Sequence, residues 1–171
     1  MELAMRDNAK YYREHQQFRQ WWLWFVILIG PITILAVFLP QMISSYAKDG
    51  SANIDLGLTL IMFVSAIGPG LFIFYLRLDT NVQQDGVYIK FKPFHRKWVI
   101  FPFETIKQAT PVTYRPIRDY GGWGIRYGNK GKAYNVSGNE GVLLEFTKAK
   151  PILIGSQKSQ DLSTVINKYL S

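Results

Sequence analysis

Two long stretches without a charged residue constrain this chain more than any other feature. They cover residues 21–39 and 56–76. About 20 apolar residues at ~1.5 Å rise per residue span a hydrocarbon layer about 30 Å thick. That layer offers no water to unpaired backbone groups, so a spanning segment must be helical. The sequence therefore predicts two transmembrane helices in a hairpin. Two buried helices of a soluble core are the alternative, but such helices usually carry a polar face.

The charge distribution orients this hairpin. Before residue 21 there are four Lys/Arg and three Asp/Glu, and the connection at residues 40–55 has one Lys and two Asp. From residue 77 onward there are fifteen Lys/Arg and seven Asp/Glu, which gives this part the whole formal charge of +8. Positive residues near helix ends stay in the cytoplasm. We therefore expect both termini in the cytoplasm and an extracytoplasmic loop at residues 40–55.

Aromatic and basic residues mark the expected membrane boundary. Residues 1–20 are polar with interspersed aromatic side chains, and we expect an interfacial segment there, helical as it runs into the first span. Trp21, Trp22 and Trp24 stand where an aromatic belt is expected, and Arg77 closes the second span. A ligand-binding aromatic cage is the alternative to the belt.

Each apolar stretch contains a helix breaker, Gly30-Pro31 in the first and Gly68-Pro69-Gly70 in the second. Proline removes a backbone donor and clashes with the preceding turn, so we expect kinks at Pro31 and Pro69. Small residues near Pro69 allow close helix packing, either within the hairpin or against another protein. Neither stretch holds an ionisable group, which argues against a proton relay or a transporter site.

From residue 77 to the end the pattern changes to short strands with turn signals between them. Asp85-Gly86 is a turn dipeptide followed by the alternating strand 87–91. Further strand candidates lie at residues 97–103, 111–114, 132–136, 141–146 and 151–155. The chain ends in an amphipathic helix, with Ser159 as the expected N-cap and Asp161 in its first turn. This pattern predicts an α+β domain of about seven antiparallel strands, closed as a barrel or sandwich by the C-terminal helix.

Three stretches carry a resemblance to a known group of proteins. They are the two glycine-rich runs at residues 114–126 and 131–142 and the preceding run at 92–98. The region from Asp79 to Leu170 resembles bacterial membrane proteins of unknown function that have two spans and a pleckstrin-homology-like (PH-like) domain. The resemblance implies a PH-like fold in a bacterial cytoplasmic membrane. It brings no catalytic residues.

The usual catalytic patterns are missing from the sequence. The chain has no cysteine and only two histidines, His15 and His95, so thiolate chemistry is excluded and a metal site is not expected. Gly131-Lys132 fails the phosphate-binding loop because Arg126 stands at its first position and Ala133 at its last. The sequence therefore predicts no enzyme, no cofactor and no metal, although an enzyme acting on lipid stays as a minor alternative.

Basic residues surround the glycine-rich turns, and we take five of them as the candidate ligand-binding face: Arg115, Arg118, Arg126, Lys130 and Lys132. On adjacent strands they would form one positive surface for anionic lipid headgroups, each attracted by about 1 kcal/mol. Glycines 121 and 122 would then direct backbone amides toward an anion. The alternatives are a solvated surface and internal ion pairing of Arg118-Asp119 and Glu140. For the glycines themselves we favour the structural reading, in which they serve tight turns only.

The function expected from these features is non-enzymatic. A membrane-anchored PH-like module would bind lipid headgroups, a protein partner or a second copy of itself at the cytoplasmic face. An accessory subunit of a larger membrane complex is the second hypothesis. Nucleic acid would suit the net charge of +8, but membrane tethering makes it the poorer partner. The ligand, the partner and the oligomeric state are not encoded in any motif.

Overall fold

The computed structural model describes residues 12–18, 21–49, 56–128 and 130–170, without the side chains of six residues in the helices. The chain forms two compact units. One is Arg19–Tyr75, and the other combines Met1–Phe18 with Leu76–Ser171. The second unit is therefore discontinuous in sequence: it is formed by the segments that precede and follow the first unit.

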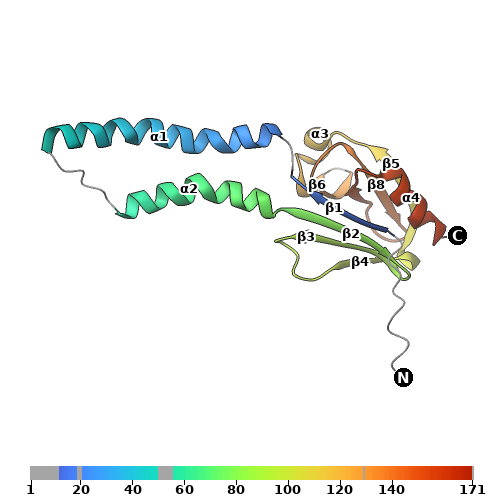
Figure 1. Ribbon diagram of the computed structural model, residues 1–171. Coiled ribbons are helices and arrows are strands. Elements are labelled where there is room, and N and C mark those ends of the chain that lie inside the picture. Colours follow the sequence, from blue (N-terminus) through green and yellow to red (C-terminus); the bar gives the residue numbers. More distant parts are fainter. Residues whose placement is uncertain (1–11, 19–20, 50–55, 129, 171) are drawn as a thin grey trace, which may run out of the picture. The chain divides into compact units, whose positions relative to one another are not determined.

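The first unit consists of two helices that lie side by side (Figure 1), α1 (Trp21–Asp49) and α2 (Leu56–Tyr75). The segment Leu23–Ala47 of α1 is long and apolar enough to cross a membrane, with a mean hydropathy of 2.4, and none of it is buried. Among the described residues it is the one helix that meets both conditions. The apolar segment Thr59–Tyr75 of α2 is shorter. A core helix of a soluble protein would instead be covered by its neighbours.

The prediction of a loop at residues 40–55 is wrong for its first ten positions, because helix α1 continues to Asp49. Pro40 removes only one hydrogen bond of the helical ladder, and residues 41–49 contain neither glycine nor proline. Both expected kink sites, Pro31 and Pro69, lie inside helices that continue on either side of them. The bends themselves stay predictions, and residues 50–55 lie outside the described part of the chain.

The expected interfacial helix before the first span is also wrong where the structure describes it. Residues Tyr12–Gln17 form strand β1, which pairs antiparallel with β2 (Arg77–Gln83) from Tyr12↔Val82 to Gln17↔Arg77. The helical hairpin is thus inserted between two neighbouring strands of one sheet. The domain predicted to start at residue 77 needs β1 as well. Residues 1–11 and 19–20 lie outside the description.

The first sheet has the strand order β1-β2-β3-β4, with β3 at Gly86–Lys92 and β4 at Val99–Pro102. The hairpin expected at Asp85-Gly86 is confirmed, and Gly86 is already the first residue of β3, opposite Gln83. A Cβ atom on Gly86 would lie 2.4 Å from the carbonyl oxygen of Phe101, so only glycine lets β4 approach here. The inner face of this sheet carries fully buried side chains: Leu78, Val82, Val87, Ile89 and Phe91.

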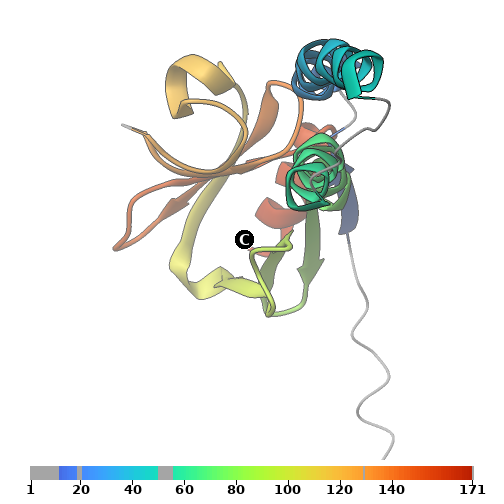
Figure 2. The same ribbon diagram turned by 90° about the vertical axis from the view of Figure 1, so that its left-hand side faces the viewer.

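The second sheet follows a short 3-10 helix η1 (Phe103–Thr105) and has the strand order β5-β8-β9-β7-β6. Its strands are β5 (Ile106–Thr113), β6 (Gly124–Gly128), β7 (Gly131–Asn135), β8 (Glu140–Phe146) and β9 (Ile152–Gly155). All pairs are antiparallel except β7 with β9. Figure 2 shows strands of the two sheets on opposite sides of the domain. The α+β class is confirmed, but the described residues hold nine strands, one pair of them parallel, rather than about seven antiparallel ones.

The C-terminal helix α4 (Ser159–Lys168) packs against β5 and β8 through buried Leu162 and Ile166. Ser159 is not its N-cap, since it lies inside the helix and its hydroxyl donates to Glu140 Oε2 at 3.2 Å. Asp161 is in the first turn, as expected. Asn167 binds Ala109 twice, donating to its carbonyl at 2.8 Å and accepting from its N–H at 3.1 Å. These bonds occupy backbone groups of β5, which is an edge strand of its sheet.

Candidate functional site

The first glycine-rich stretch forms a short helix, α3 (Pro116–Tyr120), which the sequence reasoning did not predict. Proline at the first helical position and Gly121 in the left-handed conformation, with φ 72°, delimit it. The N–H of Gly121 donates to the carbonyl of Ile117, and the N–H of Gly122 donates to that of Pro116. Both amides therefore close the helix, in line with the structural reading of these glycines, and the alternative use of Gly121-Gly122 as an anion-binding pair does not fit.

Helix α3 covers one face of the second sheet. Beneath it, Tyr114 and Tyr120 pack edge to face at 5.9 Å and join Ala133 and Leu153 in a small buried cluster. Burial raises the pKa of Tyr114 to about 12, because the charged phenolate would lose its water. The glycine-rich runs thus serve turns and packing, which is the structural reading favoured for them from the sequence.

The five predicted basic residues do not form one surface. In the register of β6 with β7, Arg126 lies opposite Ala133 and Tyr127 lies opposite Lys132. Directly opposed side chains share a face and successive ones alternate. Arg126 is therefore on the α3 side of the sheet, whereas Lys132 is on the other side with Tyr127 and Tyr134.

Three of the five basic side chains are engaged within the domain. Lys130 Nζ lies 3.6 Å from Asp119 Oδ1, and Arg126 Nε–H donates to the carbonyl of Trp123 at 2.9 Å. Lys132 Nζ lies 4.6 Å from the ring centre of Tyr134 and 5.1 Å from that of Tyr127, as in cation–π contacts. Burial acts to lower the pKa of Lys132, but the two tyrosines outweigh it and raise the pKa above its ordinary value.

Arg115 and Arg118, at the start and in the middle of α3, are exposed. The backbone N–H of Arg115 donates to Asp119 Oδ2 at 2.9 Å. This bond, with the nearby charge of Lys130, keeps the pKa of Asp119 below its usual value. The expected internal pairing is thus found for Asp119, with Lys130, whereas the carboxylate of Glu140 accepts from Ser159.

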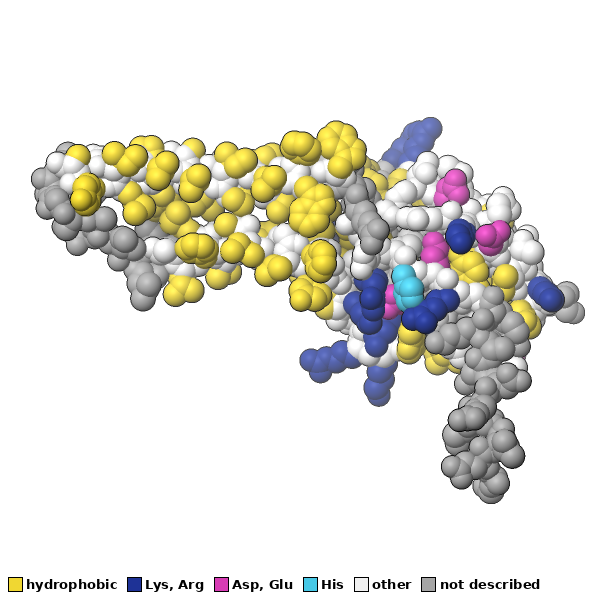
Figure 3. Space-filling view, in the orientation of Figure 1, with side chains coloured by type: hydrophobic (Ala, Val, Ile, Leu, Met, Phe, Trp, Pro, Cys, Tyr) yellow, Lys and Arg dark blue, Asp and Glu magenta, His cyan; other side chains and the backbone are white. Residues whose placement is uncertain are grey.

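A second group of basic residues, which the sequence reasoning missed, lies on the outer face of the first sheet. Strand alternation places on this face the residues Arg13 and His15 of β1, Arg77 and Asp79 of β2, and Lys90 and Lys92 of β3. We call these six residues the basic sheet face. Figure 3 shows Lys and Arg side chains gathered around a histidine on the domain. The face carries four permanent positive charges and one carboxylate.

Asp79 organises the basic sheet face. Its side chain is 4% exposed and receives three cationic or polar groups: Arg77 Nε at 3.0 Å, His15 Nδ1 at 2.6 Å and Lys92 Nζ at 3.5 Å. Arg13 Nε–H donates to His15 Nε2 at 2.7 Å, so the proton of a neutral His15 is on Nδ1 and is donated to Asp79. One carboxylate thus holds residues of three strands in place and leaves the face positive.

The sequence signal for this face was a pair of charged or titratable residues two positions apart in each strand, which places both on one face of the sheet. The pairs are Arg13-x-His15, Arg77-x-Asp79 and Lys90-x-Lys92. It was overlooked because Arg13 and Arg77 are separated by the whole hairpin. Arg77, predicted as the last residue of the membrane boundary, is the first residue of β2 and an ion-pair partner of Asp79.

The inner side of β1 connects the two sheets. Gln16 is 1% exposed and donates through Nε2 to the carbonyl of Gly155 at 2.6 Å. Glu14 accepts from Tyr12 at 2.8 Å, from Ser156 Oγ at 2.6 Å and from the N–H of Gln157 at 2.8 Å. Burial and the neighbouring Glu14 raise the pKa of Tyr12 well above its usual value. Strand β1 is therefore fixed to the junction between β9 and α4.

The loop between β3 and β4, residues 93–98, carries exposed aromatic and basic side chains. Phe94 is 59% exposed and Trp98 is 38% exposed, with exposed Arg96 and Lys97 between them. His95 closes the turn, since its N–H donates to the carbonyl of Phe91 at 2.7 Å and its Nδ1 accepts from the N–H of Phe91 at 3.3 Å.

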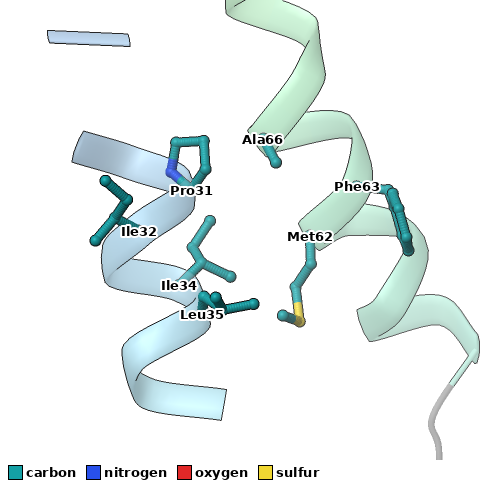
Figure 4. A pocket seen from close by; sticks show the side chains of 7 residues that line it. All are labelled: Pro31, Ile32, Ile34, Leu35, Met62, Phe63 and Ala66. Atoms are coloured by element: carbon teal, nitrogen blue, oxygen red, sulfur yellow. The ribbon is translucent and has the colours of Figure 1, made fainter. Parts of the chain in front are cut away.

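In the helical unit, the groove between α1 and α2 is apolar (Figure 4). Pro31, Ile34 and Leu35 of α1 face Met62 and Ala66 of α2 across a space of about 300 Å³. The groove offers packing surface but no polar group for a specific ligand. Of the predicted belt, Trp21 is 74% exposed and Trp24 40%, whereas the side chain of Trp22 lies outside the described residues.

Within the described residues, no three His, Asp or Glu side chains are grouped as metal ligands. Comparisons of the chain with protein-family models, with curated proteins and with solved structures find no match. The PH-like resemblance stated above therefore stays a prediction.

Proposed function

We propose that this protein is a non-enzymatic binding module of a bacterial cytoplasmic membrane. A two-helix anchor would hold a PH-like domain against the anionic lipid of the inner leaflet. The observation that carries the proposal is the pairing of β1 with β2 across the hairpin.

This pairing bears on the number of membrane crossings. Residues before α1 and after α2 belong to one sheet, so both must lie on the same side of any membrane. A chain that crosses once through α1 must return before β2 begins, and α2 is the helix between them. The candidate span in α1 thus supports a second crossing through α2, although the apolar segment of α2 is shorter.

The basic sheet face supports the choice of anionic lipid as the ligand. Gln17 and Arg77, which are paired, adjoin the hairpin, and Arg77 is also paired with Lys92. The row of His15, Asp79 and Lys90 lies about 7 Å farther along the strands at ~3.3 Å per residue. Both rows are therefore within about one Debye length, ~8 Å at physiological salt, of the sheet end that adjoins the hairpin.

Cysteine labelling tests the topology, because the natural chain has no cysteine background. Ser51→Cys lies in the expected external loop, and Thr164→Cys lies on the exposed side of α4. In intact cells a membrane-impermeant maleimide should label Ser51→Cys, and it should label Thr164→Cys only after lysis. Labelling of both positions from the same side would contradict the proposal.

Lipid selectivity of the reconstituted full chain tests the ligand. Lys90→Gln with Lys92→Gln removes two charges from the basic sheet face and leaves Arg77 and His15 on Asp79. At ~1 kcal/mol for each lysine, the preference for spin-labelled phosphatidylglycerol over phosphatidylcholine should fall by up to about 30-fold. The matched control, Lys148→Gln with Lys150→Gln, changes exposed lysines of the β8–β9 connection and should keep the preference. Equal losses in both variants would exclude a specific role of the face.

A second candidate function is that of an accessory subunit in a membrane complex. It is favoured by the apolar groove between α1 and α2, which could accept a helix of a partner. Purification in mild detergent distinguishes the two, because a monodisperse lone monomer would count against the subunit role.

A further inference from the structure

We infer that the loop between β3 and β4 inserts its aromatic side chains into the headgroup layer of the membrane that holds the hairpin. The inference deepens the proposed function and rests on it. It assigns residues 93–98 as a second contact with the bilayer, separate from the helices.

The position of the loop in the sheet is the first argument. Strand β3 ends at Lys92, which is paired with Arg77, and the loop continues beyond this pair. Arg77 is two residues after the end of α2, and its other neighbour, Gln17, is four residues before the start of α1. The loop therefore projects from the end of the sheet at which the chain enters and leaves the hairpin (Figure 1).

The composition of the loop is the second argument. Phe94 and Trp98 are exposed on the surface of the domain, and Ile100, two residues after Trp98, is 47% exposed. Trp rings favour the membrane–water interface, whereas Lys and Arg side chains there are attracted by anionic headgroups. Arg96 and Lys97 supply these charges, and Lys90 Nζ lies 5.9 Å from the ring centre of Trp98.

The loop is also held in shape before any contact with lipid. Two hydrogen bonds close its first turn, one from the His95 N–H to the Phe91 carbonyl and one from the Phe91 N–H to His95 Nδ1. The His95 ring packs edge to face on buried Tyr134, with ring centres 5.7 Å apart. The rings of Trp98 and Tyr88 pack edge to face with their centres 6.5 Å apart. Because His95 and Tyr88 fix both ends, Phe94 and Trp98 are presented with little further ordering cost.

Depth measurements on the full chain in vesicles containing phosphatidylglycerol test the inference. A nitroxide is attached to Phe94→Cys, to Lys97→Cys or to the control Ile117→Cys, which is on α3 and 70% exposed. The quantity measured is the accessibility of the nitroxide to oxygen relative to a water-soluble nickel chelate. We expect a several-fold higher ratio at position 94 than at position 117, with position 97 between them.

A ratio at position 94 equal to that at 117 would overturn the inference. If Ser51→Cys is still labelled from outside in that case, the proposed anchor stands and only the loop contact is wrong. If Ser51→Cys shows that the hairpin does not cross, both fail. Since Lys97 is exposed, the Lys97→Cys label provides a second measure of loop insertion should Phe94→Cys perturb the turn. A ratio at 97 equal to that at 117 would likewise contradict insertion.

Discussion

Strand β1 and the glycine-rich segment from Tyr114 to Asn135 make an instructive pair. The six residues of β1 are almost entirely polar and were predicted as part of an interfacial helix, yet they complete a sheet and connect it to the second one through Glu14 and Gln16. The glycine-rich segment looked like a ligand site, yet its amides and most of its cations are engaged within the domain. Most of the basic residues that cluster in sequence thus form hydrogen bonds, ion pairs or cation–π contacts with their own neighbours. The positive face is formed instead by residues that only the fold brings together.

The largest effect expected from this comparison concerns β1. Deletion of residues 1–17 would leave Gly155 without the Gln16 donor and expose the edge of β2, so we expect the domain not to fold. Replacement of residues 18–76 by Asn-Gly should leave it folded, because Gln17 and Arg77 are direct partners and a two-residue turn suits such a pair. Circular dichroism and thermal unfolding of both variants check this.

A cooperative unfolding transition in the variant without β1 would show that the strand is dispensable. Failure of the Asn-Gly variant alone would mean that the hairpin is needed for the domain to fold, which the separation into two compact units does not suggest.

The next largest effect is expected from glycine substitutions, which test whether the glycines of the glycine-rich runs serve packing. A Cβ on Gly131, which has φ 109°, would lie 2.1 Å from the carbonyl oxygen of Pro151, so Gly131→Ala should lower the free energy of unfolding by about 3 kcal/mol or more. Gly138 also has a positive φ, 74°, but nothing lies within 4 Å of its Cβ position, so Gly138→Ala should cost about 1 kcal/mol. Denaturant unfolding of both variants gives the two values. Equal costs would mean that the close approach of β7 to Pro151 is unimportant.

The third effect compares the two sets of basic residues directly. Arg115→Gln with Arg118→Gln removes the same charge as Lys90→Gln with Lys92→Gln. Because α3 is at neither connection to the hairpin, we expect the loss of lipid selectivity from the α3 pair to be at most a third of that from the lysine pair, and close to that of the Lys148/Lys150 control. Spin-label lipid selectivity at low and high salt measures both losses. A larger loss of lipid selectivity from the α3 pair than from the lysine pair would favour the binding face predicted from the sequence.

Local patterns in the sequence predicted most of the elements. Length and lack of charge gave the two apolar helices, although α1 continued past Pro40. Alternation and turn residues gave β3, β4 and β7 to β9 approximately, but only the end of β5, and no strand was predicted at β2 or β6. The polar strand β1, the parallel pair β7–β9 and helix α3 were missed, because long-range pairing and capping fix them rather than propensity. The candidate site was misplaced for the same reason: Asp79 contacts basic side chains on three strands, and no local motif records these contacts.

The smallest effect concerns His95, through which the first sheet contacts Tyr134 of the glycine-rich segment. Burial and the nearby charge of Lys132 lower the pKa of His95 below its ordinary value of about 6.5. The unfolded chain therefore binds this proton more readily than the folded one. The stability that neutral His95 contributes is present above pH ~6.5 and is lost as the pH falls through the lowered value.

Replacing His95 by Phe keeps a ring against Tyr134 but removes the acceptor for the N–H of Phe91, so this variant should lose part of its stability at pH 7 and show less further loss on acidification. His15→Gln, at the other histidine, is the control. The measurement is the free energy of unfolding between pH 5 and 8 (~6.5 being the ordinary midpoint of histidine). An unchanged pH dependence in His95→Phe would mean that protonation of His95 does not loosen the turn. Spin-label mobility at Lys97→Cys follows the same turn directly, and it should rise on acidification in the natural background but not with His95→Phe.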